Sequence, residues 1–343
     1  LILGNSATIS NVTFVRPANF YFSGFSNIPH ITYFLIFLCF AYIMIVVGNV
    51  FLMSLIYLVK SLHSPKYMIV FNLALADLCG STALIPKLFE TFLFDRSDIV
   101  FEDCLSYMFF VYFFTDVQSW ILVIMAYDRF IAICFPLRYH SIVTKPAIAA
   151  MLLLVWVVLL SISASMVGLV DRVSFCGSLV IQSFFCDFGI ILELACGDTS
   201  LYSSFSFVSF LLSVCLPPIL IILTYICIAI ALSRVASRKE RLKALKTCTS
   251  HLILVAICFS PVLYISIAYS ISGLDRNGRI VNITLAYIVP PLLNPILYSL
   301  KTEEVLNSIK KLCNNMLSNI TMSKKVFTAM LTKWKVLKWH TKV

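Results

Sequence analysis

Long apolar runs, separated by short polar stretches, fill most of the chain. Each run approaches the roughly 20 residues that a helix needs to cross the hydrocarbon core of a bilayer, and the weak period-two alternation of a membrane β-barrel is absent. This pattern predicts an all-α membrane protein, a seven-transmembrane helix bundle. The expected spans are residues 31–59, 67–88, 104–133, 147–170, 201–232 and 279–300, with a sixth span between the last two of these.

Prolines and single polar residues interrupt these runs. Leu216-Pro217-Pro218 lies inside the fifth span, and it must kink or locally break that helix because proline lacks an amide donor and clashes with the preceding turn. Asn49 is one amide in the otherwise apolar first span. A hydrogen bond to a neighbouring helix is its favoured role.

Composition and charge agree with a membrane protein. The chain has 12% charged and 60% hydrophobic residues and a mean hydropathy of +0.96, whereas roughly a quarter of a soluble domain is charged. The net charge of +10 could suggest nucleic acid, but the basic residues follow the topology instead. With the N-terminus outside, 20 of the 26 Lys and Arg residues fall on the cytoplasmic side and six outside, which is the positive-inside pattern. Membrane lipid, and no nucleic acid, is the expected surrounding.

Three regions follow from this topology: residues 1–30 as an extracellular tail, 31–300 as the membrane domain and 301–343 as a cytoplasmic region. Asn11 opens a sequon and is the expected glycosylation site. The tail lacks a signal-peptide pattern, so the first span is expected to act as the insertion signal. Residues 301–313 are predicted to form a short amphipathic eighth helix along the inner surface.

Two acidic residues, Asp77 and Asp116, fall inside predicted spans. A carboxylate at membrane depth needs a partner, a proton or a cation, and it marks a functional site by default. Asp116 shares a polar band with Thr115, Gln118 and Ser119. It could be the counter-ion of an amine ligand, or an acid that stays neutral or hydrogen-bonded within the bundle. The residues alone leave both roles open.

An adjacent acid and base, Asp128 and Arg129, close the third span within MAYDRFIAICFPLRY (residues 125–139). By itself such a pair could simply mark the end of a span, since charges commonly flank membrane helices. The longer string closely resembles the signature that ends the third helix of vertebrate olfactory receptors, which are rhodopsin-like G-protein-coupled receptors. Phe130 and Phe135 are mild departures, where that family usually has Tyr and often His.

The resemblance covers roughly residues 20–312. SPKYMIVFNLALADL (64–78), KALKTCTSHL (243–252) and PPLLNPILYSL (290–300) are similar to motifs of the family's second, sixth and seventh helices. Cys258-Phe259-Ser260 stands where the family has Phe-Tyr-Gly, and Pro261 behind it supplies a kink differently. The resemblance implies a multi-pass receptor of the plasma membrane.

The resemblance also implies roles for individual residues. The activation switch and G-protein coupling would rest on Asp128, Arg129, Tyr225, Asn294, Pro295 and Tyr298. Asp77 would join a state-sensing polar cluster with Asn49, Gln118 and Asn294, near which the family binds sodium. Olfactory receptors often carry Glu where Gln118 stands, so a sodium site near Asp77 would have one negative charge fewer.

Four cysteines lie in outer segments, an oxidising compartment: Cys104, Cys176, Cys186 and Cys196. Four cysteines allow three pairings. The similarity to the long second outer loop of olfactory receptors implies Cys104–Cys186, which ties this loop to the third helix, and Cys176–Cys196, which closes the loop on itself.

The function that the resemblance implies is an odorant-type receptor. A small-molecule odorant would bind in the outer half of the bundle, and a stimulatory G protein would then raise cyclic AMP. Ligand pockets are mostly apolar with a few placed polar groups. The candidate ligand-binding residues, each of which could equally be packing, are Tyr112, Thr115, Asp116, Ser209, Phe210, Phe259, Leu263 and Tyr287.

Other classes fit the sequence less well. A retinal protein needs a Lys in the last span, and none lies between Arg279 and Leu300. The repeated halves of a transporter are not evident. No catalytic constellation or metal-ligand spacing indicates an enzyme, and no cofactor is expected. A non-olfactory receptor of the same superfamily is the alternative; it would keep Arg129 and Asn294-Pro295 but not the loop cysteines or the 243–252 stretch.

Overall fold

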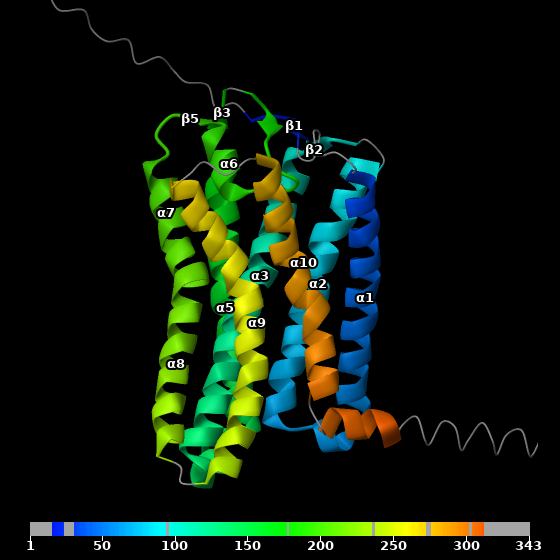
Figure 1. Ribbon diagram of the computed structural model, residues 1–343. Coiled ribbons are helices and arrows are strands. Elements are labelled where there is room, and N and C mark those ends of the chain that lie inside the picture. The colour runs from blue at the N-terminus through cyan, green and yellow to red at the C-terminus, as the bar shows by residue number, and fades with distance from the viewer. Residues whose placement is uncertain are drawn as a thin grey trace, which may run out of the picture.

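The computed structural model describes residues 16–23, 31–93, 96–176, 178–234, 237–271, 276–301 and 304–311. The expected glycosylation site Asn11 and the basic tail beyond residue 311 lie outside the described residues. The chain forms a bundle of long helices, with short strands and a small helix gathered at one end (Figure 1). That end carries the segments expected outside the membrane, and we call it the outer end.

Seven helical rods make up the bundle in the described part of the chain. By length and composition six of them could cross a membrane, while the apolar stretch of the remaining one, His251–Pro261, is shorter. The rods are α1 (Ile31–Leu58), α2 (Pro65–Leu93), α3 (Phe101–Cys134), α5 (Lys145–Val170), α7 (Ser200–Phe210) continued by α8 (Leu216–Ser233), α9 (Arg238–Ile271) and α10 (Arg276–Lys301).

Some helices extend past the predicted spans. α2 ends at Leu93 rather than near Leu88, and Lys87 pairs with Glu90 at 3.1 Å in its outer part. α3 begins at Phe101 rather than Cys104, with two acidic residues in its first turn, where they complement the helix dipole. Hydropathy marks where a helix leaves apolar surroundings, not where its backbone hydrogen bonds end. The predicted spans were therefore shorter than these two helices.

The fifth rod contains the irregularity predicted from its prolines. A five-residue π-helical segment, η3 (Leu211–Cys215), separates α7 from α8, and Pro217 and Pro218 follow in the first turn of α8. Proline cannot donate a hydrogen bond to the preceding turn. A π-bulge is one way for the backbone to re-pair its remaining groups, and such bulges often lie at functional sites.

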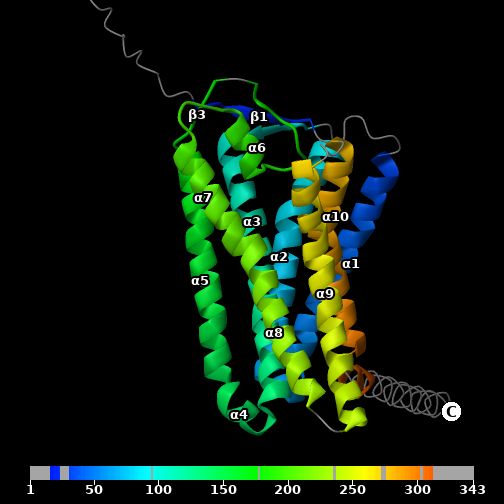
Figure 2. The ribbon, with the colours of Figure 1, turned by 60° about the vertical axis from the view of Figure 1, so that its left-hand side comes forward.

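Short strands close the outer end, a feature that the apolar pattern did not predict. β1 (Asn19–Phe22) pairs antiparallel with β2 (Asp98–Val100) and parallel with β4 (Val180–Ile181), and β3 (Ser174–Phe175) pairs antiparallel with β5 (Ala195–Cys196). Figure 2 shows β1, β3 and helix α6 (Phe188–Glu193) lying over the outer ends of the rods. We call these strands and α6 the outer cap.

Arg16 fastens the N-terminal segment of the outer cap to the bundle. Its guanidinium lies 3.1 Å from Glu102 and 3.0 Å from Asp171, and 4.6 Å from the centre of the Phe101 ring. Phe20 is completely buried and packs against the same Phe101 ring. The outer cap and the first turn of α3 therefore share one core.

Two disulfides join the outer cap to the bundle and to itself. Cys104 of α3 is bonded to Cys186, with Cα atoms 5.6 Å apart. Cys176 is bonded to Cys196 beside the paired strands β3 and β5, with Cα atoms 5.8 Å apart. These are the pairs that the family resemblance implied.

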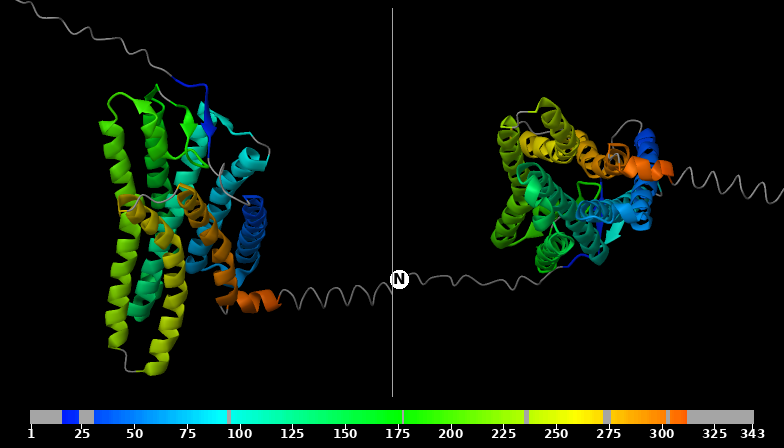
Figure 3. Two further views of the ribbon diagram at one scale, coloured as in Figure 1. Left: turned by 45° about the horizontal axis from the view of Figure 1, so that its top comes forward. Right: turned by 90° about the horizontal axis from the view of Figure 1, so that it is seen from below.

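At the inner end, short turns connect the rods: η1 (Lys60–Leu62), η2 (Pro136–Arg138) and α4 (Tyr139–Ile142). Residues 304–311 form a short helix that lies crosswise to the rods at the edge of the inner end, beside α1, as the view from below shows (Figure 3). The Tyr67 hydroxyl donates to Glu304 at 2.5 Å, and Lys66 Nζ lies 3.9 Å from the same carboxylate. These contacts hold the start of the short helix against α2.

Candidate functional site

A cavity of about 380 Å³ lies between the rods, directly below α6. This volume is at the lower end of the range for small-molecule pockets, roughly 300–1,000 Å³. Its walls come from α3, α5, α7, η3, α9 and α10, and the loop around α6 forms its roof. Seven of the eight residues predicted from the sequence line this cavity: Tyr112, Thr115, Asp116, Ser209, Phe210, Phe259 and Tyr287.

Leu263 corrects the eighth of these predictions. It does not line the cavity, and 38% of its side chain is exposed, whereas Phe259 lines the cavity and is buried. Residues four apart share one face of a straight helix, but Pro261 lies between these two in α9. Proline interrupts the hydrogen-bond ladder and allows the helix to bend. The sequence alone does not give the direction of that bend.

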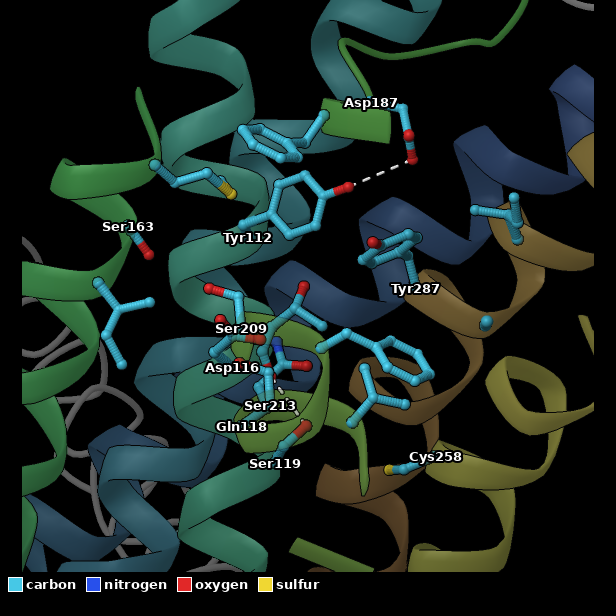
Figure 4. Close-up of a pocket in the computed structure, with 18 of the residues that line it drawn as sticks. Tyr112, Asp116, Gln118, Ser119, Ser163, Asp187, Ser209, Ser213, Cys258 and Tyr287 are labelled. Carbon is cyan, nitrogen blue, oxygen red and sulfur yellow. Dashed lines mark hydrogen bonds between the residues drawn. The ribbon is translucent and has the colours of Figure 1, made fainter. Parts of the chain in front are cut away.

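Asp187 ties the roof of the cavity to α3. One carboxylate oxygen accepts from the backbone N–H of Ile190 at 3.2 Å and caps α6, and the other accepts from the Tyr112 hydroxyl at 3.2 Å (Figure 4). The Phe185 ring lies 5.7 Å from the ring of Tyr287 in α10. Asp187 was not among the residues predicted to line the cavity. Its position directly after Cys186, which the resemblance ties to the third helix, is the feature of the sequence that could have indicated it.

Hydroxyl groups surround Asp116 in the deeper part of the cavity. Figure 4 shows Ser209 and Ser213 beside Asp116. The Thr115 hydroxyl donates to the backbone oxygen of Val111 at 2.7 Å, and the Ser119 hydroxyl donates to the backbone oxygen of Thr115 at 3.1 Å. Both hydroxyls thus use their hydrogens on their own helix and offer only oxygen lone pairs to the cavity.

The polar cluster implied by the resemblance is only partly assembled around Asp77. Asn294 Nδ2 donates to Asp77 Oδ2 at 2.7 Å. Gln118 Nε2 donates instead to the backbone oxygen of Ala76 at 3.3 Å. The second oxygen of Asp77 and the side-chain oxygen of Asn294 are buried without a hydrogen-bond partner among the described residues. Hard cations prefer such all-oxygen surroundings, and a sodium ion near Asp77 stays a prediction.

Asn49 does not donate to Asp77, the centre of the predicted polar cluster, but to backbone oxygens. Its amide donates to the backbone oxygens of Ile45 at 2.9 Å and of Pro291 at 3.1 Å. Pro295 has no N–H with which to pair the carbonyl four residues earlier, so Asn49 satisfies the oxygen that this proline leaves free. The helix-to-helix hydrogen bond favoured from the sequence is present, between α1 and α10.

The inner ends of α3, α8, α9 and α10 meet around Arg129. Asp128 Oδ1 accepts from the Tyr139 hydroxyl at 2.7 Å, and Asp128 Oδ2 lies 4.0 Å from Arg129 Nε. Asp128 is buried and the Arg129 side chain is 16% exposed. Burial, and then the charge of Asp128, raise the pKa of Tyr139 above its usual value, so this phenol remains a donor.

Two further contacts at this end involve residues predicted as switch members. The Tyr225 hydroxyl and His251 Nδ1 lie 2.9 Å apart and join α8 to α9. The Tyr298 hydroxyl contacts the sulfur of Met125 at 3.2 Å and joins α10 to α3. Sequence reasoning did not name Tyr139 or His251 as partners, although both stand within the motifs that carry the resemblance.

The comparisons with known proteins agree with this architecture. The sequence profile of the olfactory receptor family matches residues 38–316. Olfactory receptor 1 of Rattus norvegicus is 34% identical over 271 residues, which are 79% of this chain and 86% of that protein. Olfactory receptor 1500 of the same species is 32% identical over 293 residues, 84% of this chain and 92% of that protein.

A solved structure shares the fold. The crystal structure of squid rhodopsin superposes with a TM-score of 0.67 at 18% identity, covering 84% of this chain and 87% of that chain. At this identity the likeness shows the fold alone, and it confirms the predicted seven-helix bundle. The family matches decide against the non-olfactory alternative. The chain therefore belongs to the olfactory receptor family, as a multi-pass plasma-membrane G-protein-coupled receptor of the odorant type and not an enzyme.

Proposed function

We propose that this receptor binds a small odorant in the cavity below α6 and then activates a stimulatory G protein, which raises cyclic AMP. The observation that carries the proposal is the course of α3. This helix contributes Tyr112 and Asp116 to the cavity, and it contributes Asp128 and Arg129 to the contacts at the inner end. A displacement of α3 at the cavity would therefore also move Asp128 and Arg129 at the inner end.

Two other rods connect the cavity to the inner end in the same way. α7 and η3 line the cavity with Ser209 and Ser213, and the continuing α8 carries Tyr225. α10 carries Tyr287 at the cavity and Tyr298 at the inner end. A ligand shifts the receptor toward signalling only if it binds the signalling state more tightly than the resting state. Because the three rods contribute residues to both sites, a ligand that binds the signalling state more tightly can change the contacts at the inner end.

The test is a cyclic AMP assay in cells that express the receptor with an olfactory-type stimulatory G protein, challenged with an odorant panel. We expect a ligand-dependent rise that is lost in Arg129→Ala, because Arg129 is the basic partner of Asp128 at the inner end. Arg172→Ala is the matched control, since it removes an exposed arginine from the outer end and should respond as the unchanged receptor does.

All three proteins are compared at equal surface level, measured with an extracellular tag. Equal odorant responses from Arg129→Ala and the unchanged receptor would contradict the proposed role of the inner contacts. A flat response from surface-expressed receptor to every odorant, together with a response through another G protein, would contradict the stimulatory coupling.

A further inference from the structure

The charged residues described at the cavity are all acidic. Of the described residues that line it, Asp116 and Asp187 are acidic and none is Lys, Arg or His. Asp187 has both carboxylate oxygens engaged, by Tyr112 and by the N-terminus of α6. Among the described residues, no Lys, Arg or His forms an ion pair with Asp116. Asp116 is thus the cavity acid that the protein itself leaves without a counter-ion.

A carboxylate at this depth is costly to ionise without a partner. A neutral ligand leaves that cost in place, and an anionic ligand adds repulsion. A cationic ligand instead supplies the missing charge inside the helix bundle, where the attraction between opposite charges is stronger than in bulk water. The chemistry of the cavity therefore selects for positive charge.

The hydroxyls of the cavity favour a ligand rich in donors. Thr115 and Ser119 have used their hydrogens on their own helix and present acceptor oxygens. Ser163 is an independent sign of a missing polar partner: it lines the cavity, its side chain is only 1% exposed, and its hydroxyl has no hydrogen-bond partner among the described residues. A primary ammonium group has three donors and no acceptor, which complements this set.

We propose that the cavity takes a small primary amine in its protonated form, with the ammonium group on Asp116 and an apolar body against residues such as Met166 and Phe259. Both of these side chains line the cavity, and its volume of about 380 Å³ suits a small molecule. The inference rests on the proposed ligand site but not on the choice of G protein.

The experiment measures binding without signalling. The full chain is purified in detergent, and its melting temperature is recorded with primary alkylamines from butylamine to octylamine and with the alcohols of equal chain length. We expect amines, and not the matched alcohols, to raise the melting temperature. Asp116→Asn keeps the shape and removes the charge; it should weaken amine binding by about 100-fold, the usual order for losing one partner of a buried charge pair.

Asp103→Asn is the matched control, because it makes the same change at an exposed position on the same helix, and it should leave amine binding unchanged. Alcohols that stabilise as well as amines, equal affinities in the two variants, or no stabilisation by any amine at about 1 mM would each overturn the inference. Amine binding without a cyclic AMP response would keep this inference and overturn the proposed coupling. A cyclic AMP response to alcohols but not to amines would keep the proposed coupling and overturn this inference.

Discussion

At the scale of single residues, Gly48 matters because it allows α1 to approach α10 closely. A Cβ atom added at this position would lie 2.9 Å from Cγ of Pro295, closer than real carbon contacts. We expect Gly48→Ala to push the two helices apart, to weaken the bond from Asn49 to the Pro291 carbonyl, and to destabilise the receptor by about 1–3 kcal/mol, as overpacking usually does. The measurement is the melting temperature of purified receptor at fixed detergent and lipid.

Gly168→Ala is the control for this residue. Gly168 lies in α5, and a Cβ atom there would meet nothing within 4 Å. Because alanine favours a helix over glycine by about 1 kcal/mol, Gly168→Ala should be neutral or stabilising. Equal melting temperatures for the two variants would show that the contact between Gly48 and Pro295 does not limit stability.

At the scale of elements, the outer cap depends on few and partly exposed contacts. Arg16 makes two ion pairs and lies over the Phe101 ring. Exposed ion pairs contribute about 0.2–1 kcal/mol each, and an exposed cation–π contact about 0.5–1 kcal/mol. We therefore expect Arg16→Ala to weaken the attachment of β1 by roughly 1–2 kcal/mol.

Amide hydrogen exchange of the purified receptor tests this expectation. The backbone amides of Tyr21 and Phe22 donate to Leu179 and Ser97, and both should exchange about tenfold faster in Arg16→Ala, since 1.4 kcal/mol is a factor of ten. Amides in the middle of α3 provide the internal reference, and Arg96→Ala removes a nearby exposed arginine for comparison. Unchanged exchange in β1 would show that strand pairing and Phe20 suffice.

The sequence predicted some elements of the structure better than others. Run length is enough to detect six of the seven rods in the described part of the chain, because each must satisfy its backbone within the bilayer, but it does not fix where the helices end. The outer cap escaped prediction because its strands, two to four residues long, pair across segments far apart in the chain. Leu263 was misplaced for a different reason: Pro261 lies between Phe259 and Leu263 in α9, and the sequence does not give the direction in which a proline bends a helix.

At the scale of the whole molecule, the receptor is a bundle with two linked ends. The outer cap lies over one end of the rods (Figure 1). Both disulfides and the cavity belong to that end, and the contacts around Arg129 lie at the other. α3 runs from Cys104 at the outer cap to Arg129 at the inner end. A ligand that binds only the signalling state has an apparent affinity that rises in proportion to the population of that state. A change at the inner end that favours the signalling state should therefore also raise affinity at the cavity.

Asp128→Asn tests this coupling. Asparagine keeps an oxygen that accepts from Tyr139 but loses the charge that faces Arg129. If that charge stabilises the resting arrangement, its loss should raise ligand-independent cyclic AMP by about fivefold, and ligand affinity should rise in parallel, as expected for a coupling free energy of about 1 kcal/mol. Asp103→Asn, measured at equal surface level, should change neither quantity. A rise in basal signalling with unchanged ligand affinity would show that the two ends are not coupled through Asp128.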